Sequence, residues 1–228
     1  MLKEKQFEFD LKGVSVAIGM PAYRGVVPID TMNGLVEVFM KKITSLALIT
    51  ERENAIVSHA RNKIVNRFLK ETDFQKLVFI DDDIVFGNAE FERLVCWGTK
   101  YPIVCGAYPM RDYPLTFPVN MDTPPKLNEH GLIQVYGTGL GFTCIDRKVF
   151  EQIDAPEYSY KGDTLKGYFN MEFKDGAFIG EDMYFFKKWV AQGGEIWMDP
   201  LIKLGHFGNH VYEGDFSQLI SEKLLEGK

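Results

Sequence analysis

Short apolar runs alternate with stretches of helical periodicity along the first half of the chain. Apolar runs at 14–18, 45–49, 77–80 and 103–105 predict strands. Between them, apolar positions recur with a period near 3.6 after Asp30, Asn54 and Asn88, which predicts three helices. The run at 77–80 has no polar position, as expected for a strand buried on both faces. This alternation predicts an α/β fold, with a mostly parallel central sheet and helices on both faces.

The second half of the chain has a weaker pattern. Residues 108–130 contain five prolines and are expected to be irregular. Strands are predicted at 132–136, 142–145, 196–198 and 201–204, and helices at 148–153 and 181–192. The stretch 154–180 has little pattern, and a long structureless segment in a compact domain is usually functional or mobile. We find no repeat or linker and expect one domain over 1–228, with halves at 1–107 and 108–210 and a C-terminal helix or tail at 211–228.

Composition excludes some classes of protein. The formal net charge is −6 without an evident basic face, which disfavours binding of long nucleic acids. Cys96, Cys105 and Cys144 form no C-x-x-C pair, so we interpret them as unpaired thiols in a reducing compartment. The N-terminus has no secretory signal, and no run reaches the ~18 apolar residues that would span a bilayer. A cytoplasmic protein without an integral membrane segment is therefore expected.

The triplet Asp81-Asp82-Asp83 directly follows the apolar strand predicted at 77–80. In open α/β sheets, ligands bind at the carboxyl ends of the strands. Three adjacent carboxylates repel one another unless a cation compensates them, and Mg²⁺ and Mn²⁺ prefer oxygen ligands. On an extended backbone Asp81 and Asp83 point the same way and Asp82 points elsewhere. A divalent-cation site is therefore predicted here, with a solvated acidic turn as the alternative.

The segment 78–84, Val-Phe-Ile-Asp-Asp-Asp-Ile, resembles the D-x-D element of glycosyltransferases with the GT-A fold. Further segments resemble that family in the same order: 17–23 its first strand and nucleotide-binding loop, 58–62 its A-R-N helix, 180–182 its E-D element, and 205–208 its late histidine. The resemblance covers residues 14–208. It implies a Rossmann-like GT-A sheet, a nucleotide-sugar-binding first half and an irregular acceptor-binding second half.

The resemblance also implies roles for individual residues. Mn²⁺ or Mg²⁺ would be held by Asp81, Asp83 and His206. The nucleotide-sugar donor, most simply a UDP-sugar, would contact Pro21, Tyr23, Arg61, Asp81 and Asp82. Asp182, with Glu181 as second candidate, would serve as the catalytic base of an inverting enzyme or position the acceptor in a retaining one. At the start of a helix, backbone N–H groups favour the ionised form of Asp182.

Simpler interpretations of these residues stay open. Asp182 is also compatible with a helix-start carboxylate, Arg61 with a solvated helix residue, and His206 with a buried histidine bonded to the backbone. The glycine-rich stretch 137–141 lies between two predicted strands, so we do not interpret it as a dinucleotide fingerprint. The family's longer motif after the E-D helix is only loosely matched at 185–189, which argues against processive polymer synthesis.

The predicted activity is that of a hexosyl- or pentosyltransferase acting on an acceptor hydroxyl. A nucleotidyltransferase or a non-catalytic nucleotide-sugar-binding protein is the alternative, although the loop after the first strand holds only Arg24 as a basic residue. The acceptor could be a glycan, a lipid-linked sugar, a protein or a modified DNA base. The sequence leaves the donor sugar, the stereochemistry and the oligomeric state open.

Overall fold

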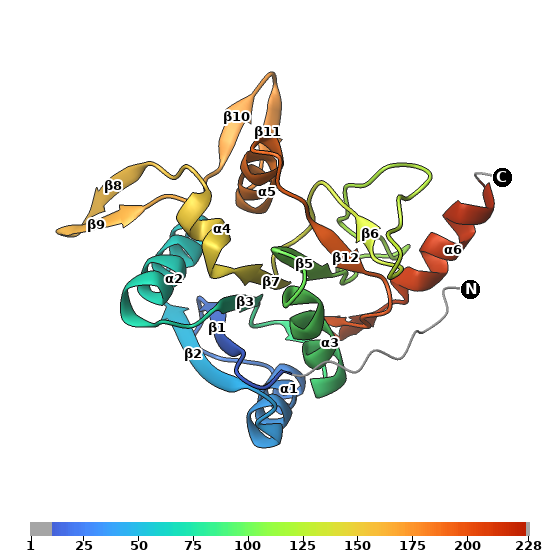
Figure 1. The fold of residues 1–228 in the computed structure, drawn as a ribbon, viewed down its shortest axis with the longest axis horizontal. Helices are drawn as coiled ribbons and strands as arrows, with labels where there is room; N and C mark the ends of the chain where they lie inside the picture. Colours follow the sequence, from blue (N-terminus) through green and yellow to red (C-terminus); the bar gives the residue numbers. More distant parts are fainter. Residues whose placement is uncertain (1–10, 227–228) are drawn as a thin grey trace.

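The computed structural model describes residues 11–226 (Figure 1). Residues 1–10, which fall in the N-terminal stretch interpreted above as lacking a secretory signal, and residues 227–228 of the predicted C-terminal tail lie outside the described residues.

A seven-stranded sheet in the order β2-β1-β3-β7-β5-β12-β6 forms the centre of the molecule. Five of its strands share one direction: β1 Ser15–Ala22, β2 Ser45–Arg52, β3 Lys76–Ile80, β5 Ile103–Gly106 and β12 Trp197–Asp199. The other two, β7 Phe142–Asp146 and β6 Ile133–Gln134, run antiparallel to their neighbours. The mostly parallel sheet predicted from the sequence is thus present.

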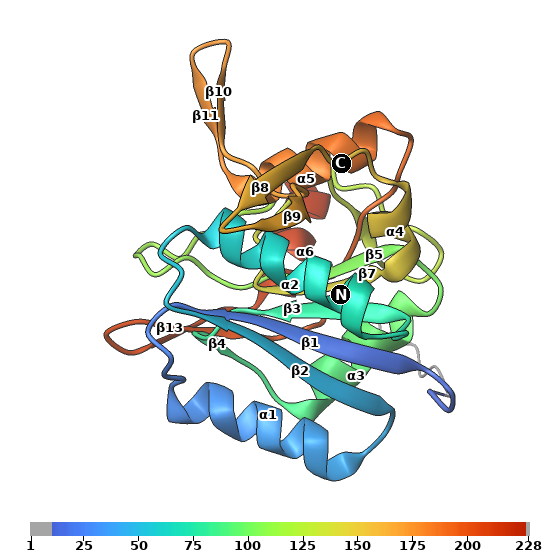
Figure 2. The ribbon, with the colours of Figure 1, turned by 90° about the vertical axis from the view of Figure 1, so that its left-hand side faces the viewer.

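Helices cover both faces of this sheet and create two hydrophobic cores (Figure 2). α2 Val57–Glu71, α4 Arg147–Gln152 and α5 Glu181–Ala191 pack on one face, together with α6 Phe216–Glu226. α1 Ile29–Lys41 and α3 Asn88–Gly98 pack on the other. Successive β3 residues alternate between the cores, Phe79 in the first and Ile80 in the second. Burying each such side chain contributes about 1.5–3 kcal/mol.

A small antiparallel sheet lies beyond the carboxyl end of β3. It consists of β4 Ile84–Val85, β13 Gly205–Phe207 and β14 Val211–Glu213, with His206 paired to Ile84. The strand predicted at 201–204 is wrong. The Asp199 carboxylate accepts a hydrogen bond from Leu201 N (3.0 Å), which stabilises a turn there. The buried side chains of Ile202 and Leu204 therefore come from irregular backbone.

The weakly patterned segment at 154–180 contains two hairpins. β8 Glu157–Tyr160 pairs with β9 Asp163–Lys166, and β10 Glu172–Lys174 pairs with β11 Ala177–Ile179. Both central residues of each turn, Lys161-Gly162 and Asp175-Gly176, have positive φ. Such two-residue turns match the twist of antiparallel strands. The second hairpin projects from the molecule, at the end opposite α1 (Figure 1).

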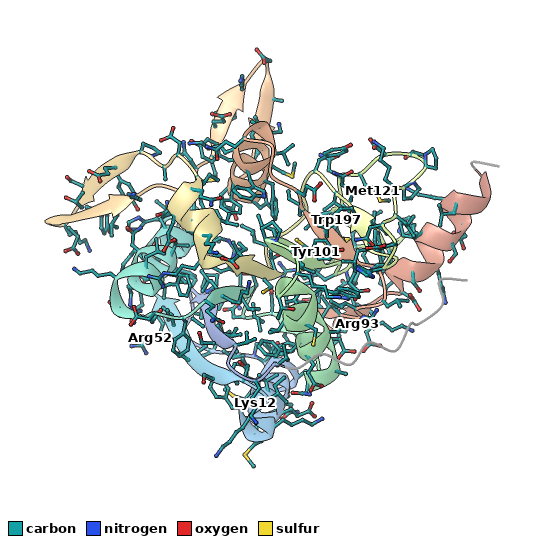
Figure 3. All side chains as sticks on the ribbon, in the orientation of Figure 1. Lys12, Arg52, Arg93, Tyr101, Met121 and Trp197 are labelled. Atoms are coloured by element: carbon teal, nitrogen blue, oxygen red, sulfur yellow. The ribbon has the colours of Figure 1, made fainter. Side chains whose placement is uncertain are left out.

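Aromatic packing joins the far strands of the sheet to the segment after α3. The rings of Tyr101 and Trp197 lie 5.5 Å apart between centroids (Figure 3). Trp97 of α3 donates from its indole nitrogen to the buried Asp199 carboxylate (2.8 Å). Across residues 11–226, no helix has both the length and the apolar character needed to cross a membrane.

Candidate functional site

The three aspartates lie in a tight turn where β3 ends. Asp81 N donates to the carbonyl oxygen of Gly141, the residue before β7 (3.0 Å), and Ile84 N donates back to Asp81 O (3.1 Å). β4 then begins at Ile84 and pairs with β13. The chain therefore changes direction within the triplet, so the aspartate side chains meet different partners.

Asp81 is bound by Arg61 of α2. The guanidinium lies 3.0 Å from Asp81 Oδ2 through Nη2 and 2.9 Å from Oδ1 through Nη1. Its Nε lies 3.6 Å from Glu181 Oε1 at the start of α5. Arg61 is buried, so it is not a solvated helix residue. Its guanidinium thus lies beside both Asp81, a predicted nucleotide-binding residue, and Glu181, a predicted catalytic residue.

Asp83 meets His206 and Arg111 instead. Asp83 Oδ2 lies 3.5 Å from His206 Nε2 and accepts a hydrogen bond from Arg111 Nη1 (2.9 Å). Burial disfavours the charged carboxylate, but the hydrogen bond and charge of His206 and the charge of Arg111 outweigh it and lower the pKa of Asp83. Arg111 also donates to Phe207 O (3.2 Å), which ties the proline-rich segment to β13.

The ring of His206 is oriented by the backbone. Its Nδ1 lies 2.9 Å from Pro109 O, and because a carbonyl only accepts, Nδ1 carries the proton. In the neutral ring the lone pair of Nε2 then faces the Asp83 carboxylate. Two acceptors face each other only when a proton or a metal ion lies between them. A backbone carbonyl that fixes the second ring nitrogen is also typical of metal-binding histidines.

These residues fit a divalent cation with two protein ligands. Within the described part of the chain, no group of three His, Cys, Asp or Glu side chains lies close enough to hold a metal. Asp83 and His206 are together, whereas Asp81 is engaged by Arg61. Mg²⁺ and Mn²⁺ sites commonly use one or two protein ligands and complete the shell with water and substrate phosphates. The metal role of Asp81 stays a prediction.

Asp82 lies between the aspartate turn and the loop after β1. Burial, followed by the charges of Asp83 and Asp81, raises the pKa of Asp82 to about 6, while Arg24 opposes this rise. Arg24 follows Tyr23 directly, so the loop after β1 is electrostatically coupled to the triplet. Pro21 is within β1, and Tyr23 is exposed in the loop. Neither makes a hydrogen bond or ion pair with the aspartates, and their nucleotide contacts stay a prediction.

Asp182 opens α5 beside Glu181. Burial raises the pKa of its carboxyl, and the charge of Glu181 raises it further, against a backbone hydrogen bond from Met183 N (2.6 Å). This direction is opposite to the one expected from its place at a helix start, because burial outweighs the helix N–H groups. A carboxylate with a raised pKa is a stronger base once ionised.

Tyr108 is a site residue that the sequence analysis missed. Its hydroxyl accepts a hydrogen bond from Gly141 N (3.3 Å), and its ring makes an edge contact with His206 at 5.2 Å. A Cβ at Gly139 would lie 1.9 Å from that hydroxyl, and one at Gly141 would lie 2.9 Å from Asp81 Oδ2. The glycine-rich stretch thus leaves room for Tyr108 and Asp81, although its spacing alone gives no signal for this.

A separate groove lies between α2 and the β8–β9 hairpin. Its volume is about 1000 Å³, and its lining includes Lys63, Arg67, Tyr160 and Lys166. None of the predicted site residues lines it. The first half of the segment at 154–180 therefore lines this groove on the outer side of α2.

No protein-family model matches the chain, and no curated protein sequence matches it. Solved structures do match its fold. A197 from STIV matches with a TM-score of 0.57 and 23% identity, over 86% of this chain and 86% of that chain. GalNAc-T7, solved with UDP, GalNAc and Mn²⁺, matches with a TM-score of 0.54 and 11% identity, over 86% of this chain and 44% of that chain. At these identities the likeness shows the fold alone, and the predicted GT-A-like α/β fold is confirmed.

Proposed function

We propose that this protein is a metal-dependent glycosyltransferase that transfers a sugar from a nucleoside diphosphate sugar to an acceptor hydroxyl. The observation that supports this proposal is the pairing of Asp83 with His206 at the carboxyl end of β3, directly beside the Arg61–Asp81 ion pair. A solved structure of similar fold, GalNAc-T7, holds UDP, GalNAc and Mn²⁺. We propose a UDP-sugar as donor and Mn²⁺ or Mg²⁺ as cofactor.

Asp83 and His206 would hold the cation, with Asp81 as a further candidate. When bound, a divalent cation supplies positive charge to the leaving diphosphate. Arg111 would move from Asp83 to the phosphates, since a guanidinium binds phosphate oxygens well. Pro21, Tyr23 and Asp82 would contact the nucleoside, and Arg61 would fix the carboxylate of Asp81 toward it.

Asp182 is the proposed base of an inverting reaction. The attacking hydroxyl must lose its proton as the bond to the sugar forms, and an ionised carboxylate within hydrogen-bond reach accepts it. Glu181 is the weaker candidate, because its Oε1 faces Arg61 Nε. In a retaining reaction Asp182 would position the acceptor. Either role requires that Asp182, in the first turn of α5, lies on the acceptor side of the bound donor.

The first test separates the three classes of function. Wild-type protein is titrated with UDP by calorimetry, with and without Mn²⁺, and UDP-sugars are then assayed for UDP release. We expect Mn²⁺-dependent binding and slow release of UDP. Asp83→Asn should lose both, by at least ~10²-fold in rate, because losing even a residue that only orients a metal ligand costs about 10–100-fold. Asp163→Asn, an exposed carboxylate of β9, is the matched control and should behave as wild type.

Other outcomes of this test would contradict the proposal. Mn²⁺-dependent binding without any turnover, even with acceptors, would indicate a non-catalytic binding protein. Release of pyrophosphate from nucleoside triphosphate and sugar phosphate would indicate a nucleotidyltransferase. If Asp83→Asn binds UDP and Mn²⁺ as the wild-type protein does, Asp83 does not hold the metal ion. With a donor identified, a glycan, a lipid-linked sugar, a protein and modified DNA can be compared as acceptors.

We also propose a cytoplasmic location. All three cysteines, Cys96, Cys105 and Cys144, are free and buried, and burial raises the pKa of each thiol. Free buried thiols are usual for proteins of a reducing compartment.

A further inference from the structure

The groove between α2 and the β8–β9 hairpin has no part in the proposed transfer reaction. In both Figure 1 and Figure 2 the hairpin lies beside α2. The third side of the groove is the end of β2 and the loop after it, residues 51–54. Its volume of about 1000 Å³ is at the upper end of the range for small-ligand sites, so it has room for several linked rings.

Contacts within the chain hold the walls of this groove in place. Lys63 of α2 is ion-paired to Glu51 of β2, and both residues line the groove. Asn66 of α2 makes two hydrogen bonds to the backbone of Lys166 in β9, both 3.0 Å long. The hairpin and β2 are thus fixed to α2 before any ligand binds, which lowers the entropy cost of binding.

Tyr160 presents an aromatic ring to the groove, where it is 41% exposed. The ring of His59 supports it by an edge contact, with 4.2 Å between the centroids. His59 Nδ1 is itself within hydrogen-bond distance of Tyr158 Oη (2.8 Å). The ammonium of the exposed Lys161 lies 5.3 Å from the Tyr160 centroid, so polar groups reach this ring from solvent. A supported, half-exposed ring can stack on the C–H face of a sugar.

The charges that line the groove are nearly balanced, with six basic and five acidic residues. A polyanion such as nucleic acid needs a surplus of positive charge. An apolar ligand needs an apolar lining, whereas the aliphatic residues here are only Leu69 and Leu165. A sugar hydroxyl both donates and accepts hydrogen bonds, so it matches a lining that sets ammonium and guanidinium donors among carboxylate acceptors.

We propose that this groove binds an oligosaccharide, at a site separate from the proposed transfer site. Sugar rings would stack on Tyr160, and their hydroxyls would bond to charged side chains of both walls. Lys70 on α2 and Glu157 on β8 line the groove and make no ion pair within residues 11–226, so their hydrogen-bonding groups are available to the ligand.

α2 separates this groove from the transfer site. Arg61 reaches Asp81 and Glu181 on the inner side of the helix. Lys63, two positions further, reaches Glu51 in the groove. Two positions turn an α-helix by about 200°, so the two side chains leave α2 on opposite sides.

A second sugar site would keep a glycan acceptor on the protein and raise its local concentration at the transfer site. This role rests on the proposed function, whereas the binding of an oligosaccharide in the groove does not.

Saturation-transfer-difference NMR tests the binding without metal or nucleotide. The probes are short linear oligosaccharides of glucose, galactose, mannose and N-acetylglucosamine. We expect signal transfer to the ring protons of at least one of them, whose affinity calorimetry then measures. Tyr160→Ala should weaken this binding by about 5–10-fold because the stacking surface is lost, and Tyr160→Phe should keep most of it. Phe173→Ala removes an exposed ring from the other hairpin and should bind as wild type.

Two further variants separate the groove from the hairpin fold and from the transfer site. Lys70→Ala changes the α2 wall without touching the hairpin and should weaken binding by about 2–5-fold. Asp83→Asn, which should lose UDP and Mn²⁺, should still bind the oligosaccharide as wild type does. Failure of the proposed function would therefore leave this binding in place. Thermal unfolding checks that each variant folds.

Three outcomes would overturn the proposal. The first is that none of the four kinds of oligosaccharide binds the wild-type protein. The second is that Tyr160→Ala and Lys70→Ala both fold and bind as wild type, so that the sugar lies outside the groove. The third is that Asp83→Asn loses the oligosaccharide, which would place the sugar in the transfer site.

Discussion

At the residue scale, a cationic side chain occupies the place beside Asp83 that the proposed metal ion would take. Arg111 Nη1 donates to Asp83 Oδ2, and half of its side chain is exposed, so it can leave. Metal binding must displace it. We expect Arg111→Ala to raise the affinity for Mn²⁺ by about 1.5–5-fold, because an exposed ion pair of about 0.2–1 kcal/mol no longer competes.

Manganese titration followed by electron paramagnetic resonance measures this affinity without turnover. Lys41→Ala on α1 removes the same charge elsewhere and serves as the control. The same variant should bind UDP with Mn²⁺ more weakly than wild type if Arg111 then contacts phosphate. An unchanged Mn²⁺ affinity in Arg111→Ala would show that Asp83 does not hold the metal.

The raised pKa of Asp182 gives a pH dependence. Only the ionised carboxylate accepts a proton, so the rate should fall as pH drops through the pKa of Asp182. Burial and Glu181 raise this pKa, so the acidic limb of kcat/KM should lie above the ordinary range of an aspartate. Asp182→Asn should lower the rate by ~10²–10⁴-fold and flatten that limb while UDP affinity stays nearly unchanged. A parallel loss of UDP affinity would instead assign Asp182 to the nucleotide site.

The residues found from sequence are those that sit beside a strong local pattern. The triplet at 81–83 follows an apolar strand, and Arg61 lies in a short motif on a helix. Arg111 and Tyr108 lie in an irregular proline-rich segment, and their contacts join positions 28 and 33 residues apart. Such contacts depend on the path of the irregular chain, which no periodicity predicts.

At the element scale, two asparagines of α2 hold the β8–β9 hairpin and the chain that follows it. Asn66 donates to Lys166 O (3.0 Å) and accepts from Lys166 N (3.0 Å). Asn62 does the same with Phe169, at 2.9 Å in both directions, in a buried position. Each side-chain amide thus makes the two backbone hydrogen bonds that a neighbouring strand would make. Asn66 does so for Lys166 in β9, and Asn62 does so for Phe169 after the hairpin.

We expect these two asparagines to differ in effect. Asn62→Ala leaves a buried N–H and C=O of Phe169 without partners and should lower the free energy of unfolding by about 1–3 kcal/mol. Asn66→Ala should change global stability little but speed hydrogen exchange in β9, where water can replace the bonds. Urea denaturation and hydrogen exchange measure the two effects. Unchanged exchange in Asn66→Ala would show that the hairpin is held by other contacts.

This anchoring changes the expectation of a mobile segment at 154–180. Weak hydrophobic patterning there reflects exposed hairpins, in which most strand residues face solvent, as Phe173 of β10 does. The turn pairs Lys161-Gly162 and Asp175-Gly176 were the available local signal, since Asp-Gly favours tight hairpins. Ordering on donor binding is now expected in the β10–β11 hairpin, next to Glu181, and not in β8–β9. Hydrogen exchange with and without UDP and Mn²⁺ would distinguish the two hairpins.

At the scale of the whole molecule, the direction of the sheet follows from sequence but its order does not. Alternating strands and helices predicted a mostly parallel sheet, and β1, β2 and β3 pair as that pattern implies. The insertion of β7 between β3 and β5 joins residues about 40 positions apart or more. It was not predictable because β7 is as apolar as its parallel neighbours, so burial gives no sign of strand direction.

Arg61 links the two predicted halves of the molecule, since it reaches Asp81 from the first and Glu181 from the second. Its side chain is 4% exposed, against 23% for Asp81 and 15% for Glu181. Arg61→Met keeps much of the apolar volume but leaves two poorly solvated carboxylates without their cation. Breaking a buried pair in this way costs about 3–5 kcal/mol, and the partial exposure of Asp81 favours the lower end.

Urea denaturation of a mutant series separates this ion pair from general packing. Arg67→Met on the same helix breaks an exposed pair with Glu71 and a hydrogen bond to Thr50 O (3.0 Å), and should cost at most about 2 kcal/mol. Adding Asp81→Asn to Arg61→Met removes one of the unpaired charges, so the double variant should be more stable than Arg61→Met alone. If Arg61→Met is no less stable than Arg67→Met, or if Asp81→Asn lowers its stability further, the two halves are joined by packing and Arg61 serves the ligand alone.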